Sequence, residues 1–240
     1  MVSKNQLKLI KNLHQKKYRN QYQLFFVEGI KTVNELLKSD FEVDGLYVVG
    51  DSAAQFSSLA TSIISEKDLK KISALRSPSG VLGVFKMPKP KKVLAQDWIV
   101  ALDEVRDPGN LGTVIRLCDW FGIEHLICSK GTVDCYNPKV LQATMGSIAR
   151  VNIVYEDLGA LIEGTELPVF GAFMDGANVH HEKLPEAGIL IMGNEANGIS
   201  DAVAQNIQKK IGIPQFGDPL AESLNIATAT AILLNEIRKG

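Results

Sequence analysis

The sequence has little cysteine, few aromatic residues and no long apolar run. Its three cysteines, Cys118, Cys128 and Cys135, are odd in number and lack CxxC spacing, which disfavours a disulfide framework or a zinc site. No apolar run approaches the roughly 20 residues that span a bilayer. The lysines near the N-terminus have no apolar segment behind them, which disfavours a signal peptide. We therefore expect a protein of the reducing cytoplasm with no membrane partner and no metal.

Two common cofactor-binding fingerprints are also missing. The sequence contains neither GxGxxG nor GxxxxGK[ST], so neither a Rossmann turn nor a P-loop is identified. The hydrophobic content of 45% and charged content of 22% are ordinary for a globular protein. A chain of 240 residues suits one large domain or two modest ones.

The net charge of −1 conceals a division between two parts of the chain. Residues 1–92 hold 16 Lys and Arg against 8 Asp and Glu, a balance of +8, and the remaining 148 residues have a balance of −9. Such asymmetry indicates a polyanion as the partner of the basic part. A solvated, lysine-rich helix is the alternative explanation.

The N-terminal part is predicted to be a small α/β module. A helical pattern rich in lysine opens the chain, and turn signals separate the segments that follow it. These are strands at 24–27, 46–49 and 81–85, a helix at 30–38 and a short helix near 72–75. Two prolines and three lysines in Met87–Lys92 indicate a linker. We therefore expect a first domain over 1–87 and a linker over 88–95.

The second part, over 96–240, alternates strands with helices. Strands are predicted at 98–102, 125–128, 151–154, 169–173, 189–192 and 211–213. Helices are predicted at 113–121, 138–145, 158–162 and 226–236, with a short polar helix after Ser200. This alternation predicts an α/β fold with a mostly parallel sheet, whose ligands bind at the carboxyl ends of the strands.

Three polar clusters follow the predicted strands. Asn110 precedes a helix that carries Arg116 in a mainly apolar run, where a charge needs a partner or an anion. The second cluster is Gly193–Gly198, which contains Glu195, and the third is Glu222–Asn225. Each also has a plain structural explanation: a surface arginine on an amphipathic helix, a turn capped by asparagine, and helix N-caps.

Together these clusters resemble the three ordered motifs of the SpoU (TrmH-like) RNA 2′-O-ribose methyltransferases. The residues that carry the resemblance are Asn110-x-Gly112-x-x-x-Arg116 with Phe121-Gly122, then Met192-Gly193-Asn194-Glu195-x-x-Gly198-Ile199-Ser200, then Ile213-Pro214 and Ser223-Leu224-Asn225. The match runs from about Gln96 to the end of the sequence. Phe26–Gly29 and Pro78–Leu82 resemble the L30-like substrate-binding domain found in many members.

The resemblance implies a SPOUT-type catalytic domain with a deep C-terminal trefoil knot, acting as a homodimer with sites near the subunit interface. It implies that S-adenosylmethionine binds in the knot, mainly through backbone groups, at Met192, Gly193, Gly198, Ile213 and Leu224. It also implies a catalytic centre at Arg116, surrounded by Asn110, Glu195, Ser223 and Asn225. Because a guanidinium holds its proton firmly, we expect Arg116 to bind the target phosphate and stabilise an alkoxide, not to act as a base.

The expected substrate is RNA, ribosomal RNA in preference to transfer RNA. The candidate RNA contacts are Lys16, Lys17, Arg19, Arg76 and Arg150. Two alternatives remain: a non-catalytic RNA-binding protein on the same scaffold, and a nucleotide-dependent α/β enzyme of another kind. Asp218–Glu222 makes the loop before Ser223 longer than in many relatives, which predicts altered geometry beside the cofactor and not loss of activity.

Overall fold

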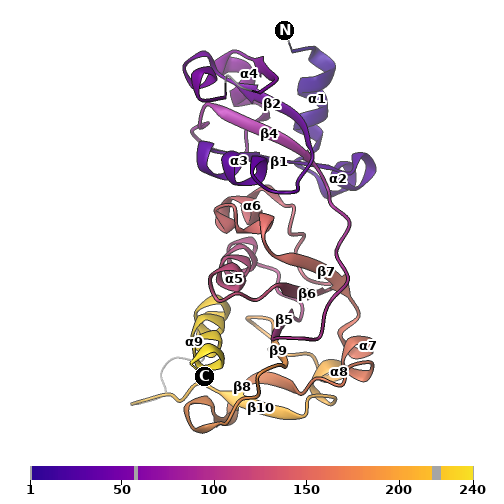
Figure 1. Cartoon of the computed structure of the whole chain (residues 1–240), viewed down its shortest axis with the longest axis vertical. Coiled ribbons are helices and arrows are strands. Elements are labelled where there is room, and N and C mark those ends of the chain that lie inside the picture. The colour runs from indigo at the N-terminus through magenta and orange to yellow at the C-terminus, as the bar shows by residue number, and fades with distance from the viewer. Residues whose placement is uncertain (1, 57–58, 218–222, 240) are drawn as a thin grey trace. The chain divides into compact units, whose positions relative to one another are not determined.

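The computed structural model describes residues 2–56, 59–217 and 223–239 (Figure 1). The chain folds into two compact units, Met1–Lys89 with Asp134–Ala149, and Pro90–Val133 with Arg150–Gly240. Residues 134–149 were expected in the second domain but pack within the first unit. No helix among the described residues has the length and apolar character needed to cross a membrane.

The first unit is built around a four-stranded sheet in the order β1-β4-β2-β3. Strands β1 (Leu24–Glu28) and β2 (Val43–Val48) pair antiparallel with β4 (Val81–Lys86), and β3 (Thr61–Ile63) lies parallel at the edge. The helical elements are α1 (Lys4–Asn12), α2 (Lys16–Tyr22), α3 (Ile30–Leu37), η1 (Gly50–Phe56), α4 (Glu66–Ile72), α6 (Pro138–Thr144) and η2 (Ser147–Ala149).

Both faces of this sheet are covered. Leu82 and Val84 of β4 pack with Ile10 of α1 and Ile72 of α4 on one face. On the other face, Phe25 of β1 contacts the rings of Phe85 and Tyr136. Alternate residues of β4 therefore enter two apolar layers, which is why the strand reads as a continuous apolar run.

The second unit contains a six-stranded sheet in the order β10-β8-β9-β5-β6-β7, and every pairing is parallel. The predicted α/β fold with a parallel sheet is confirmed. The strands are β5 (Ile99–Leu102), β6 (His125–Ser129), β7 (Asn152–Glu156), β8 (Val169–Asn178), β9 (Ile189–Met192) and β10 (Lys209–Gly212).

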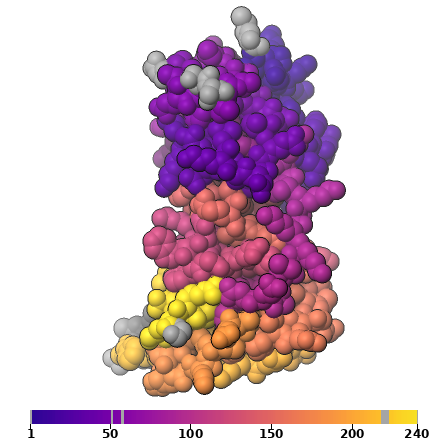
Figure 2. Space-filling model, viewed as in Figure 1, coloured from indigo at the N-terminus to yellow at the C-terminus, as the bar shows by residue number. Residues whose placement is uncertain are grey.

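Helices cover both faces of the parallel sheet. They are α5 (Pro108–Trp120), α7 (Leu158–Glu163), η3 (Val179–His181), α8 (Asp201–Ala204) and α9 (Ile226–Arg238). Apolar residues of α7 and α8 pack with those of β5 and β9 on one face. Helices α5 and α9 lie side by side over the other face (Figures 1 and 2).

Two local features differ from the sequence-based expectation. The lysine-rich N-terminal pattern forms two helices, α1 and α2, with a break between them. Helix α5 begins at Pro108, five residues earlier than predicted, because the Asp107 side chain accepts a hydrogen bond from the Asn110 backbone N–H and Pro108 suits the first helical position. Asn110 therefore lies in the first turn of α5 and not in a loop.

The predicted linker is only partly free of packing. The backbone N–H of Lys91 donates to Asn152 Oδ1, and Asn152 Nδ2 donates to the Lys91 carbonyl, both at 2.9 Å. Leu94 N–H donates to His125 Nε2 at 3.1 Å. Its C-terminal half is thus bound to strands β6 and β7 of the second unit.

Arg19, predicted to contact RNA, is instead a buried structural residue with 2% of its surface exposed. Its Nη1 donates to the carbonyls of Leu13 and His14, and its Nε and Nη2 donate to Asp134 Oδ2 at 3.1 and 2.5 Å. A charge removed from water needs such partners. The guanidinium therefore attaches residue 134 to the N-terminal helices and is unavailable to a ligand.

Asp134→Ala should lower the free energy of unfolding by about 3–5 kcal/mol, because it leaves the buried Arg19 guanidinium without its counter-charge. Chemical denaturation followed by circular dichroism measures the change. Glu42→Ala, which breaks the exposed pair with Lys86, is the matched control and should cost less than about 1 kcal/mol. Equal effects of the two substitutions would refute the structural role of the buried pair.

Candidate active site

The candidate site lies at the carboxyl ends of the central strands β5 and β9. These strands are parallel neighbours, and the Asp103 N–H donates to the Met192 carbonyl at 2.9 Å where they end. After β5 the chain continues to β6 on one side, and after β9 it continues to β10 on the other side. Loops that leave adjacent strands in opposite directions open the crevice in which α/β folds bind ligands.

Two glycines shape the loop after β9. A Cβ built on Gly193 would lie 2.2 Å from the carbonyl carbon of Gly198, so no side chain fits there. Gly198 has a φ of +68°, in the left-handed region that glycine tolerates best. Asn194 and Gly198 exchange backbone hydrogen bonds of 2.8 and 2.9 Å. Glu195 is therefore presented at the tip of a closed turn.

Asn194 joins this turn to the loop after β5. Its Nδ2 donates to the Glu104 carbonyl at 2.7 Å, and its Oδ1 accepts from the N–H groups of Ala196 and Asn197. The buried carboxylate of Asp103 accepts from the Ser200 N–H at 2.8 Å at the other end of the turn. From the sequence, an asparagine of this cluster was expected only as a turn cap, and Asp103, directly after β5, was given no role.

An ordered chain of polar side chains connects the three sequence motifs. Asn110 Nδ2 donates to Glu195 Oε1 at 2.7 Å, and Asn225 Nδ2 donates to Asn110 Oδ1 at 2.9 Å. Asn225 Oδ1 caps α9 by accepting from the N–H groups of Ala227 and Thr228. Asn225 thus acts both as the predicted N-cap and as part of the polar cluster. We call Glu195, Asn110 and Asn225 the polar array.

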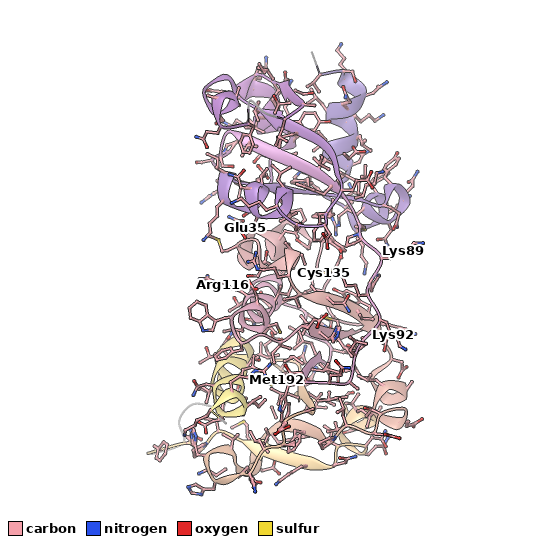
Figure 3. The ribbon with its side chains drawn as sticks, in the orientation of Figure 1. Glu35, Lys89, Lys92, Arg116, Cys135 and Met192 are labelled. Carbon is pink, nitrogen blue, oxygen red and sulfur yellow. The ribbon has the colours of Figure 1, made fainter. Side chains whose placement is uncertain are left out.

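Arg116 is not part of the polar array in this chain. Six residues advance an α-helix by about 9 Å and rotate it by about 240°, so Asn110 and Arg116 lie on different faces of α5. Arg116 is exposed beside Thr113 and Trp120, and 82% of the Trp120 surface is exposed. Figure 3 labels Arg116 on α5 and Met192 in the sheet. Among the described residues, no hydrogen bond or ion pair joins Arg116 to the array.

The remaining predicted site residues lie around the ends of β9, β10 and the start of α9. Met192 is buried at the end of β9, and Ile213 is half-buried directly after β10. Ser223 and Leu224 are exposed immediately before Asn225. The loop Asp218–Glu222 lies outside the described residues.

The predicted RNA contacts other than Arg19 are all exposed. Lys16, Lys17 and Arg76 lie on the surface of the first unit. Arg150, in the second unit, makes a bidentate ion pair with Asp119 at 2.8–3.0 Å. The part of the chain that the structure describes holds no group of three or more His, Cys, Asp or Glu suited to a metal ion.

Comparisons with known proteins give the family. Residues 97–235 match the SpoU rRNA Methylase family, and residues 4–83 match the MRM3-like substrate binding domain. The chain is 34% identical to the 23S rRNA (guanosine(2553)-2′-O)-methyltransferase RlmP of Bacillus subtilis over 98% of its own length and 97% of the relative's.

Solved structures agree over the whole chain. A putative RNA methyltransferase of the TrmH family from Porphyromonas gingivalis superposes with a TM-score of 0.90 at 36% identity, covering 100% of this chain and 99% of the other. An AdoMet-bound rRNA methyltransferase from Sinorhizobium meliloti superposes with a TM-score of 0.86 at 30% identity, covering 100% and 97%. The family match, the full-length relative and the motifs joined in the polar array agree: this chain belongs to the SpoU rRNA methylase family.

Proposed function

We infer that the protein transfers a methyl group from S-adenosylmethionine to a ribose 2′-hydroxyl of ribosomal RNA. The observation that carries this conclusion is the polar array, which joins three motifs at the sheet edge where α/β folds bind ligands. The reaction type is inferred from membership of the SpoU family. The full-length match to a 23S rRNA methyltransferase favours ribosomal RNA over transfer RNA as the substrate.

The cofactor site that we propose consists of Met192, Gly193, Gly198, Ile213 and Leu224. An adenosyl group has a flat base and polar ribose edges, so it suits apolar side chains beside accessible backbone groups. Leu224 is 51% exposed and Phe216 is 87% exposed near these loops, which provides apolar surface of that kind. When bound, S-adenosylmethionine supplies a methyl group on a positively charged sulfur.

The chain's own residues would hold the ribose and stabilise charge. Asn110 occupies one oxygen of Glu195, and among the described residues nothing donates to Oε2 of that carboxylate. We propose that Oε2 accepts a hydrogen bond from the 2′-hydroxyl and so orients a lone pair of the 2′-oxygen toward the methyl group. Arg116 would bind the target phosphate and stabilise the charge that develops on the ribose oxygen. Ser223 would contribute its hydroxyl at the same edge.

Arg116 would meet the polar array across a homodimer interface. Within one chain it lies on a different face of α5 from Asn110, in an exposed stripe with Trp120. A large exposed aromatic residue beside an arginine is typical of the centre of a protein interface. A two-fold dimer would bring the α5 stripe of one protomer to the array of its partner.

The finer features of the fold are also proposals. Helix α9 follows edge strand β10 yet packs against α5, which supports a C-terminal trefoil knot.

The match of residues 4–83 to a substrate-binding domain supports an L30-like RNA-binding domain over 1–87, joined by 88–95 to a catalytic domain over 96–240. Lys16, Lys17 and Arg76 would contact RNA phosphates there. The three cysteines are buried thiols outside any disulfide among the described residues, and we propose a reducing, cytoplasmic location.

Mapping of ribose methylation in cells with and without the protein tests the function. We expect one ribosomal 2′-O-methyl group to disappear on deletion and to return on complementation. Loss of a methyl group from transfer RNA alone would identify the other substrate class. Cofactor binding with no change in any RNA would identify a non-catalytic RNA-binding protein.

Arg116→Ala should lower methyl transfer at least ~100-fold, because it removes a charged donor aimed at the developing alkoxide. Calorimetry should find a cofactor affinity within about twofold of wild type, because Arg116 is not among the residues proposed to bind the cofactor. Lys130→Ala, which removes an exposed cation of the same unit, should leave transfer unchanged. Normal turnover by the Arg116 variant would refute its catalytic role.

Subunit mixing should reveal whether Arg116 acts across the interface. Arg116→Ala and Asn110→Ala should each be nearly inactive alone, but equal amounts exchanged into mixed dimers should recover roughly a quarter of wild-type activity. Each mixed dimer then contains one site with an intact array and an intact arginine. If Arg116 served the array of its own chain, no mixture would regain activity.

A further inference from the structure

Helix α2 is anchored by a single inward side chain and otherwise faces solvent. Arg19 is its one buried residue, held by the carbonyls of Leu13 and His14 and by Asp134. Tyr18 is half-buried, and the other residues of the helix are exposed. The buried guanidinium fixes which face of α2 points outward. The exposed side chains therefore belong to a helix with a fixed orientation.

The exposed face of α2 combines two aromatic rings with lysines. The rings of Tyr18 and Tyr22 are inclined by 13° with their centroids 6.3 Å apart, and 42% of Tyr22 is exposed. Lys17 Nζ lies 5.8 Å from the centroid of the Tyr18 ring. Lys16 is exposed at the start of the same helix. A single exposed aromatic residue is ordinary. Here a near-parallel pair of rings lies beside two lysines, so one surface offers both an aromatic ring and positive charge.

Acidic residues are absent from the sequence of these helices, and Asp134 pairs with the buried Arg19 and not with the exposed lysines. Residues 1–27 contain six Lys and Arg and neither Asp nor Glu. Two lysines elsewhere in the described part of the first unit do pair with carboxylates, Lys71 with Asp68 and Lys86 with Glu42. Among the described residues, the exposed lysines of α1 and α2 form no ion pair; they are Lys4, Lys8, Lys11, Lys16 and Lys17. The surface of these helices, indigo in Figure 2, therefore carries uncompensated positive charge.

We propose that the outer face of α2 binds an unpaired stretch of RNA, with a base stacked on Tyr22 and its flanking phosphates held by Lys16 and Lys17. This deepens the proposed function, on which it rests, by naming single-stranded RNA as the form that the first unit binds. Bases in a duplex are stacked on each other and offer no ring face, whereas unpaired bases stack on exposed aromatic side chains. The uncompensated charge suits a polyanion and disfavours a protein partner of ordinary composition.

The test measures binding of the full-length protein to two labelled probes, single-stranded oligouridine and a fully paired RNA duplex. Tyr22→Ala should weaken binding to oligouridine by about 5- to 100-fold and leave duplex binding within about twofold. Tyr22→Phe, which keeps the ring, should bind like wild type. Ile63→Ala, which removes another exposed apolar side chain of the same unit, is the matched control and should also bind like wild type.

Salt dependence separates the two kinds of contact. Lys16→Ala with Lys17→Ala should reduce the slope of log affinity against log salt by about 1.4, because each phosphate contact with single strands contributes about 0.7. Tyr22→Ala should leave that slope unchanged while lowering affinity. Circular dichroism checks that each variant retains its helices.

The outcomes distinguish this inference from the proposed function. If wild type methylates ribosomal RNA and Tyr22→Ala binds oligouridine normally, the proposed RNA-binding face of α2 is wrong and the proposed function stands. If Tyr22→Ala loses single-strand binding while wild type methylates no RNA, the RNA-binding face of α2 stands and the proposed function is wrong. Equal losses of binding to both probes, or loss of a protein partner with RNA binding intact, would also overturn the RNA-binding face.

Discussion

The structure of the candidate site depends on one close approach, between the chain leaving β5 and the chain leaving β9. Gly193 has no room for a side chain, and Asn194 bridges from the turn to the Glu104 carbonyl at 2.7 Å. Backbone polar groups at this edge need partners, and the Asn194 amide bonds the Glu104 carbonyl and the N–H groups of Ala196 and Asn197 at once. The turn is thereby closed and tied to the loop after β5. Glu195 can then meet Asn110, and the polar array forms without a metal or a disulfide among the described residues.

Two arginines illustrate how burial divides structural from functional charge. Arg19 and Arg116 both occur in helical segments, and both were predicted to act on RNA. Arg19 is buried and hydrogen-bonded to two carbonyls and a carboxylate. These partners offset the free-energy cost of removing its charge from water. Arg116 is exposed and, among the described residues, has no such partners. An arginine without internal partners is the one that remains available for an anion, which is why we retain the catalytic proposal for it.

Much of the site could be anticipated because polar residues directly after buried apolar runs are visible in the sequence. Glu195 after β9 is an example, Asn225 was visible as the N-cap of α9, and the structure brings both into one array with Asn110. The start of α5 was misjudged because the capping Asp107 and Pro108 were read as loop residues. The bond from Asn194 to the Glu104 carbonyl and the bond from the Ser200 N–H to Asp103 were not anticipated, because each joins segments far apart in the chain. A sequence contains no local signal for such partners.

The sequence by itself determined the alternation of strands and helices, the basic character of the first part and the family of the second. These follow from side-chain periodicity, composition and ordered motifs, all of which are local properties of the chain. Only the tertiary structure decided that Asn110 meets residues 85 and 115 positions away, that Arg19 is buried against Asp134, and that residues 134–149 join the first unit. These contacts depend on strand order and on which surfaces pack together, and a hydrogen bond between distant segments exists only after the sheet has assembled.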